Sequence, residues 1–239
     1  MQRAHNPAKP CREEQTLLMF FNAVEHRFCR FFCRQDSETF PALTPRFCEL
    51  MREELDHFER SDMPRAHPNT MNKNGLLLYE LGMYDELLTP LLERFVSPVA
   101  AALFDGGERE MANGSDSLDH HRSFTVRYEP EGAGKDVDLA YHFDDAEMTL
   151  NVNLGGHFEG GELLFGGLKS DGDEKHSARY PHFHREGIAI LHRGSHCHEA
   201  LPVESGKRTN LIMWCRSSQV RIRYCAMCGR DKITASKIE

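Results

Sequence analysis

A stretch of strictly alternating residues, from Met148 to Leu154, constrains the fold of this chain more than any other feature. Successive side chains of a β-strand point to opposite sides, so the stretch predicts a strand with one apolar and one polar face. The apolar face carries Met148, Leu150, Val152 and Leu154, and the polar face carries Thr149, Asn151 and Asn153. Polar side chains in a row are not ordinary core, so this face is expected to line a site for a ligand, a metal or water.

Two potential metal ligands, His142 and Asp144, stand at the head of the same predicted strand, residues 141–154. Residues i and i+2 share one side of a strand, so an imidazole nitrogen and a carboxylate oxygen can close on one ion. Alone, the pair is weak evidence, because a chain with 14 histidines produces such pairs by chance. Three His-x-Glu pairs, beginning at His57, His157 and His184, are expected on the solvated surface.

Length and charge narrow the class of protein. The 239 residues suffice for one sizeable core or one domain with an extension, and the formal net charge of −8 argues against broad nucleic-acid binding. No apolar run approaches the roughly 18 residues of a membrane helix. The first apolar stretch, residues 17–21, follows acidic residues instead of the basic start of a signal peptide. We expect a soluble intracellular protein, in the cytoplasm or the nucleus.

The eight cysteines are scattered along the chain, and without a secretory signal they are expected to be free thiols. Cys225 and Cys228 form a Cys-x-x-Cys pair, but no second pair stands at zinc-finger spacing. Structural thiols are favoured over a redox or half-zinc site.

The first hundred residues are predicted to be mainly helical. Apolar residues recur every three or four positions in 12–34, which indicates an amphipathic helix. A second helix is predicted with Thr44 as its N-cap and Pro45 in its first turn, ending before Ser61. An irregular loop then covers 61–75 and is typical of a lid or a linker.

More helix is predicted within residues 84–104, kinked or split by Pro90 and Pro98. After Asp119 the apolar period changes from that of a helix to that of a strand. Many short strands separated by glycine turns favour a β-sandwich or jelly roll. The chain is therefore expected to be α+β, with a helical region at 1–105, a β domain at 119–217 and a basic tail at 218–239.

A second constellation lies near the end of the β domain. His192, His196 and His198 share one parity, so each is a candidate third ligand, although exposed loop histidines would explain at least two of them. Two imidazoles and a carboxylate on three corners of an octahedron leave three open positions, as a non-haem Fe(II) oxygenase requires. Arg208 could hold a carboxylate cosubstrate through its planar fork, or it could be a surface arginine of the basic tail.

Several motifs follow one another in a fixed order: Tyr128, His142-x-Asp144, Gly160-Gly161-Glu162-Leu163, His198-Glu199-Ala200-Leu201-Pro202-Val203 and Gly206-Lys207-Arg208. This ordered set resembles the Fe(II)/2-oxoglutarate dioxygenases of the prolyl/lysyl hydroxylase branch. The resemblance implies a double-stranded β-helix, or jelly roll, as the catalytic core, packed on the amino-terminal helices.

The resemblance also implies roles for single residues. His142, Asp144 and His198 match the iron ligands of the family. Arg208, ten positions after His198, matches the residue that binds the far carboxylate of 2-oxoglutarate.

Weaker matches concern the cosubstrate. Tyr128, Thr149 and Asn153 fall where the family contacts 2-oxoglutarate, although Asn153 replaces a common tyrosine. His192 and His196 are left with supporting or substrate-side roles.

The implied activity is hydroxylation of a C–H bond with O2, coupled to decarboxylation of 2-oxoglutarate to succinate and CO2, with Fe(2+) as cofactor and L-ascorbate as an expected requirement. A peptidyl proline or lysine is the leading substrate, a small molecule the next and nucleic acid the last. Two alternatives stay open: a zinc-dependent hydrolase on the same ligands, and a catalytically inactive interaction protein that retains the metal site.

Overall fold

The computed structural model describes residues 37–104, 118–130, 132, 134–171, 179–223, 225 and 227–228. The helix predicted at 12–34 and most of the boundary segment 105–119 lie outside these residues. All five cysteines within them are free thiols, as predicted. In the same part of the chain, no helix is long and apolar enough to span a membrane.

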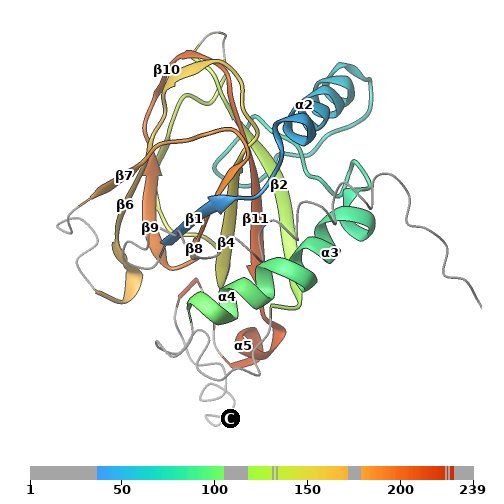
Figure 1. Ribbon diagram of the computed structural model, residues 1–239. Helices are drawn as coiled ribbons and strands as arrows, with labels where there is room; N and C mark the ends of the chain where they lie inside the picture. Colours follow the sequence, from blue (N-terminus) through green and yellow to red (C-terminus); the bar gives the residue numbers. More distant parts are fainter. Residues whose placement is uncertain are drawn as a thin grey trace, which may run out of the picture.

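Antiparallel sheets form the body of the molecule (Figure 1). The larger sheet has the strand order β1-β8-β4-β11-β2 and the smaller one β3-β9-β6-β7, and a further ladder joins β10 to β5. The larger sheet consists of β1 (Ser37–Pro41), β2 (His120–Tyr128), β4 (Met148–Asn153), β8 (Ile188–Arg193) and β11 (Arg208–Arg216). The others are β3 (Leu139–His142), β5 (Phe158–Gly160), β6 (Leu163–Leu168), β7 (Tyr180–His182), β9 (His196–Ala200) and β10 (Val203–Gly206).

The helix α2 (Pro45–Arg60) confirms the predicted start and end. Thr44 is its N-cap, and the Thr44 hydroxyl accepts the backbone N–H of Phe47 at 3.2 Å. Its buried side chains are Cys48, Met51 and Leu55. The helix thereby joins the apolar core with one side only.

The prolines split the next helical stretch, as predicted. It runs through two π-helical segments, η1 (Tyr84–Leu88) and η2 (Leu92–Val96), each followed by an α-helical segment, α3 (Thr89–Leu91) and α4 (Ser97–Leu103). A proline has no N–H to donate and its ring crowds the carbonyl four residues back. The residues before Pro90 and Pro98 donate instead across a wider turn, from Thr89 to the Tyr84 carbonyl and from Ser97 to the Leu92 carbonyl.

The two faces of the larger sheet serve different purposes. One face packs on the helices, and α4 crosses it in Figure 1. This core combines Leu150, Val152, Leu211 and Met213 of the sheet with Leu88, Leu92, Val96 and Val99 of the helices. The opposite face, with Phe124, Val126 and Ile212, turns toward Leu163 and Phe165 of the smaller sheet. On β4, the alternation predicted from the sequence therefore puts Thr149 and Asn151 on the side between the sheets, where both line a pocket.

Three features differ from the sequence expectations. The single strand predicted for 141–154 is wrong: β3 and β4 belong to different sheets, and 143–147 connect them. The edge strand β1, which pairs with β8, was not predicted, because its pairing partner lies about 150 residues away and leaves no local signal. The helix α5 (Ser218–Arg223) occupies the start of the predicted basic tail, and its Val220 is buried.

Replacing Leu150 tests this division of β4 into two faces. Leu150 is 2 % exposed in the core under the helices, so Leu150→Ala should lower the free energy of unfolding by about 2–5 kcal/mol. Urea unfolding measures the change. Leu50→Ala, at a position 45 % exposed on α2, is the matched control and should leave the midpoint nearly unchanged. Equal effects of the two substitutions would contradict the assigned core.

Candidate metal centre and adjoining pocket

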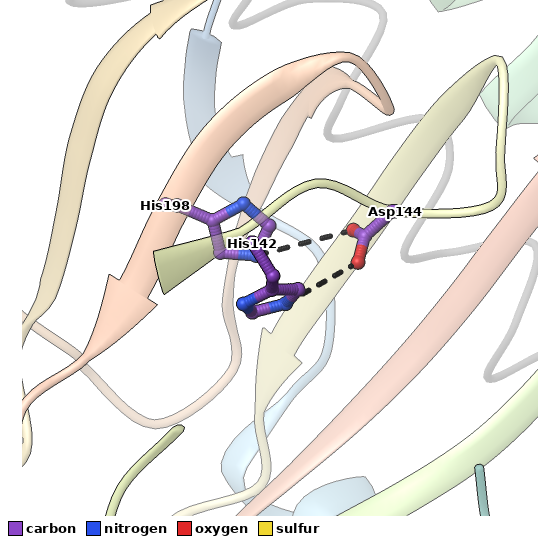
Figure 2. A group of neighbouring side chains, drawn as sticks. All are labelled: His142, Asp144 and His198. Carbon is purple, nitrogen blue, oxygen red and sulfur yellow. Dashed lines mark ion pairs between the residues drawn. The ribbon is translucent and has the colours of Figure 1, made fainter. Parts of the chain in front are cut away.

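Three side chains from two segments of the chain converge between the sheets (Figure 2). His142 is the last residue of β3, Asp144 follows in the connection to β4, and His198 is the register partner of His142 on β9. One ligand atom of each lies within 4.8 Å of the other two. The Nε2 atom of His142 is 3.6 Å from Oδ1 of Asp144, and that of His198 is 4.0 Å from Oδ2. The group is thus spaced to hold one metal ion.

The backbone fixes which nitrogen of each imidazole faces the centre. Nδ1 of His142 lies 2.7 Å from the Ala140 carbonyl, and Nδ1 of His198 lies 2.9 Å from the His196 carbonyl. A carbonyl only accepts, so each Nδ1 carries the hydrogen and each Nε2 keeps its lone pair. Both lone pairs are available for a metal ion, as in other metal-binding histidines.

Charge within the group suits a divalent cation. Burial pushes the pKa of the His198 imidazole well below its usual value, so it is neutral at physiological pH. Burial acts to raise the pKa of Asp144, but the neighbouring histidines outweigh it and the pKa falls, which keeps the carboxylate ionised. For His142 burial acts to lower the pKa, whereas the Asp144 carboxylate raises it and prevails. A bound cation would compensate the Asp144 carboxylate and favour the neutral form of His142, whose Nε2 faces that carboxylate.

The connection that carries Asp144 is held at several points. The Asp144 N–H donates to the Gly194 carbonyl at 2.8 Å, and the Gly194 N–H donates to the Glu147 carbonyl at 2.9 Å. Only glycine fits at 194, since a Cβ there would collide with the Ala146 carbonyl. The Thr149 hydroxyl donates to Oδ2 of Asp144 at 2.7 Å, so it orients the carboxylate.

Ion pairs to the carboxy-terminal segment hold the same connection from outside. The Glu147 side chain is 1 % exposed and lies 3.0 Å from Nε of Arg221, and it also accepts the Ser217 N–H at 2.6 Å. Asp145 pairs with Arg216 and Arg221 at 2.8 Å each. Arg216 and Ser217 close the predicted β domain and Arg221 lies in the predicted basic tail, and together they stabilise the turn that presents a potential metal ligand.

A pocket between the sheets adjoins the three side chains. It is lined by His142, Asp144, His198, Thr149, Asn151, Tyr128, Arg208, Asn210, Asn69, Asn72, Trp214, Met71 and six apolar residues of the strands. Polar groups therefore gather on one inner surface, and aromatic and aliphatic groups complete the wall.

Arg208 is buried in this pocket, with an exposure of 1 %. Its Nη1 donates to the Gly161 carbonyl, and its guanidinium carbon lies 4.4 Å from the centre of the Tyr128 ring. Burial lowers the pKa of Arg208, while Tyr128 and Glu162 act to raise it. The Nε atom is buried without a hydrogen-bond partner among the described residues. The alternative of a surface arginine is therefore wrong, and the guanidinium is suited to an anionic ligand.

A chain of asparagines leads from the backbone to the same pocket. The Gly155 N–H donates to Oδ1 of Asn153 at 3.0 Å, so Nδ2 of Asn153 donates onward to Oδ1 of Asn210 at 3.2 Å. Nδ2 of Asn210 then donates to Oδ1 of Asn151 at 2.6 Å. This order leaves the Asn151 amide hydrogens to face the pocket. Asn153 contacts Asn210 but does not line the pocket, whereas Asn151 does. Asn151 was not among the predicted site residues, although its position on the polar face of β4 could have indicated it.

The other two histidines of the same parity, His192 and His196, are buried as well, so the alternative of exposed loop histidines is wrong for them. His192 is fully buried, its pKa is lowered to about 4 by burial, and its Nε2 lies 4.0 Å from Oδ2 of Asp144. His196 is 2.8 Å from the Gly166 carbonyl through Nε2. His184 was expected on the surface, but it lies half-buried at 3.3 Å from Asn210. Of the three candidates on one parity, only His198 joins His142 and Asp144.

A family model and two similar relatives point to the same group of proteins. Residues 12–107 match the OGFOD2-like domain. The chain is 47 % identical over 189 residues to 2-oxoglutarate and iron-dependent oxygenase domain-containing protein 2 of Mus musculus, covering 79 % of this chain and 51 % of that protein. The Homo sapiens protein of the same name is 46 % identical, with 80 % and 52 % covered. The chain thus spans about half the length of these relatives.

Solved structures share this fold at low sequence identity. An oxidoreductase of the 2OG-Fe(II) oxygenase family from Burkholderia pseudomallei is 14 % identical with a TM-score of 0.52, covering 82 % of this chain and 89 % of that one. A Pseudomonas putida prolyl-4-hydroxylase is 12 % identical with a TM-score of 0.51, covering 84 % and 98 %. At these identities the likeness shows the fold alone, and it confirms the predicted jelly-roll class.

Removing Arg221 tests the outer support of the Asp144 connection. Arg221→Ala leaves the Glu147 carboxylate buried without its charged partner, so it should lower the free energy of unfolding by about 1–3 kcal/mol. The same variant should bind Mn(II) more weakly, as measured by calorimetry. Arg46→Ala breaks an exposed pair with Glu49 and is the control, expected to change neither quantity. If both variants behave alike, the ion pair of Glu147 has no supporting role.

Proposed function

The chain is a homologue of the 2-oxoglutarate and iron-dependent oxygenase domain-containing proteins, and from this premise we propose that it is a dioxygenase that uses Fe(II) and 2-oxoglutarate to hydroxylate a C–H bond. The observation that carries the proposal is the combination of His142, Asp144 and His198 with a buried arginine, Arg208, in one pocket. The first group suits a divalent metal ion, and the arginine suits the carboxylate of a second ligand.

In this proposal His142, Asp144 and His198 hold Fe(II). Two neutral imidazoles and one carboxylate are the donor set of non-haem Fe(II) oxygenases, which leave coordination positions open. Bound iron would supply the redox chemistry that couples O2 and 2-oxoglutarate to hydroxylation, with succinate and CO2 as coproducts. L-Ascorbate, which would keep the iron reduced, is proposed as a further requirement.

The chain itself would bind and orient the cosubstrate. Arg208 would pair with the far carboxylate of 2-oxoglutarate, with the Tyr128 hydroxyl as a second donor, since the Tyr128 ring packs against the Arg208 guanidinium. Asn151 would donate an amide hydrogen from the polar face of β4. Thr149 would act by holding Asp144 and Asn153 by holding Asn210, in place of the direct contacts expected from the sequence.

A protein is the proposed class of substrate, with a peptidyl proline or lysine as the leading candidate. Support comes from a relative whose name states lysine hydroxylation, the multifunctional procollagen lysine hydroxylase and glycosyltransferase LH3 of Rattus norvegicus. It is 30 % identical to this chain, and the matched region spans 72 % of this chain and 22 % of that protein. A small molecule is the alternative substrate. A soluble intracellular location, in cytoplasm or nucleus, remains our prediction.

Two other functions could use the same residues. A zinc-dependent hydrolase would bind zinc to the His-Asp-His group and would have no use for 2-oxoglutarate. An inactive interaction protein would bind both ligands without turnover. The buried Arg208 argues against the hydrolase, because a buried cation whose Nε has no hydrogen-bond partner among the described residues favours a ligand with a carboxylate.

The deciding experiment is anaerobic purification, addition of Fe(II) and O2, and measurement of succinate formed from 2-oxoglutarate with and without ascorbate. Many oxygenases of this kind are expected to turn over slowly without their substrate, so an unknown substrate is no obstacle. Succinate that depends on Fe(II) supports the proposal. Binding of zinc with no affinity for 2-oxoglutarate would favour the hydrolase, and binding of both ligands without succinate would favour the inactive protein.

Removing a metal ligand should abolish succinate formation. His142→Ala and Asp144→Ala each delete one donor atom, and because these side chains line a pocket the proteins should stay folded. Circular dichroism and succinate yield are the measurements. His157→Ala, at an exposed histidine, is the matched control and should retain full activity. Normal succinate yield from either ligand variant would refute the iron site.

Removing Arg208 should act on the cosubstrate. Arg208→Ala should raise the half-saturating concentration of 2-oxoglutarate by roughly 10-fold or more, since a charge-assisted hydrogen bond contributes about 1.5–3 kcal/mol. Steady-state succinate formation at varied 2-oxoglutarate measures it. The control is Arg185→Ala, at an exposed arginine outside the pocket lining, for which no change is expected. An unchanged requirement in Arg208→Ala would remove Arg208 from the cosubstrate site.

A further inference from the structure

Two buried asparagines in a loop have no place in the function proposed so far. Asn69 and Asn72 belong to the irregular segment 61–75, where residues 62–67 are exposed, yet their exposures are only 9 % and 2 %. Both line the pocket that contains Arg208. Polar side chains buried in a loop need partners, so their hydrogen bonds show what they do.

The direction of each hydrogen bond in this pair is fixed from the backbone outward. Oδ1 of Asn69 accepts the N–H of Met71 at 2.8 Å and that of Asn72 at 2.6 Å. A backbone N–H only donates, so the Asn69 atom that faces them must be the oxygen. Nδ2 of Asn69 therefore donates to Oδ1 of Asn72 at 3.0 Å, and Nδ2 of Asn72 donates to the Tyr128 hydroxyl at 3.1 Å.

This order determines where the hydrogen of Tyr128 goes. An amide nitrogen cannot accept, so the Tyr128 oxygen receives the bond from Asn72 and its own hydrogen must point elsewhere. Burial raises the pKa of Tyr128 to about 12, so the phenol keeps that hydrogen at physiological pH. The Tyr128 ring packs against the Arg208 guanidinium. The phenol hydrogen is therefore available to a ligand in the pocket that Tyr128 and Arg208 both line.

We propose that Asn69 and Asn72 are positioning residues that aim the Tyr128 hydroxyl so that it binds, together with Arg208, the far carboxylate of 2-oxoglutarate. This inference rests on the proposed function. It gives residues 68–72 a part in selecting a dicarboxylate over a monocarboxylate 2-oxo acid. Without Asn72, the hydroxyl could rotate its hydrogen out of the pocket, and the carboxylate would lose one oriented donor.

The test compares two 2-oxo acids that differ at the far end. The full chain is loaded with Mn(II), which is redox-stable and accepts the same ligand types, and is titrated calorimetrically with 2-oxoglutarate and with pyruvate. Pyruvate lacks the far carboxylate. Asn72→Leu, which keeps similar volume without polar atoms, should bind 2-oxoglutarate roughly 3- to 10-fold more weakly, as expected for one hydrogen bond, and should bind pyruvate as the native chain does.

A double-substitution cycle separates positioning from packing. In a Tyr128→Phe background the hydroxyl is absent, so adding Asn72→Leu should cause no further loss of 2-oxoglutarate affinity. The matched control is Asn74→Leu, since Asn74 lies in the same loop and donates to the Gly134 carbonyl instead. This control should leave both affinities unchanged. If Asn72→Leu does not fold, Asn72→Asp takes its place. The new negative charge would weaken 2-oxoglutarate binding with or without the Tyr128 hydroxyl, so only the part of the loss that disappears in the Tyr128→Phe background reports on positioning.

The outcomes distinguish this inference from the function on which it rests. A native chain that does not bind 2-oxoglutarate overturns the proposed function and the inference with it. A native chain that prefers 2-oxoglutarate to pyruvate, with Asn72→Leu equally selective, overturns the inference alone. An equal loss in the presence and absence of the Tyr128 hydroxyl overturns it too, because Asn72 would then act by another route.

Discussion

The opposite chemistry of the two faces of β4 is the constraint on which the rest of the structure depends. Leu150 and Val152 are buried against the helices, and because side chains alternate on a strand, Thr149 and Asn151 must then face the space between the sheets. A shift of one residue in register would expose the apolar set and bury polar groups in the core, so the register is strongly specified. Burial of the apolar face thus supplies the polar wall of the pocket.

Opposite charges share this pocket without pairing with each other. Asp144 is held by Thr149 and by the nearby histidines, whereas the Arg208 guanidinium lies against Tyr128 and bonds to a backbone carbonyl. Each charge is buried and only partly compensated, and such groups are costly unless a ligand completes them. A divalent cation at one end and a dicarboxylate reaching from it to the guanidinium would complete both. This complementarity is the physical basis of the proposed oxygenase function.

Two hydrogen-bond chains, each beginning at a backbone N–H, orient the polar side chains that line the pocket. One runs through Asn153 and Asn210 to Asn151, and the other through Asn69 and Asn72 to Tyr128. Because a backbone N–H can only donate, the orientation of every amide in each chain is set at its first bond. Rigid placement of polar groups limits the reorganisation needed on ligand binding. The ion pairs of Glu147 and Asp145 with the carboxy-terminal helix give similar support to the connection that bears Asp144.

The sequence by itself determined the local features: the capped helix at Thr44, the helical stretch interrupted at its prolines, the alternation of β4 and the candidate pair His142 and Asp144. Each of these depends on residues close together in the chain, where periodicity, capping and motif spacing can be read. His198 and Arg208 were selected as candidates by the ordered motifs of the family resemblance. Only the tertiary structure decided that 141–154 is divided between two sheets, that Arg208 is buried, that Asn151 rather than Asn153 lines the pocket, and that Asn72 reaches Tyr128. Those facts depend on strand pairing and on contacts between distant segments, and the residues near each position carry no record of which partner it will meet.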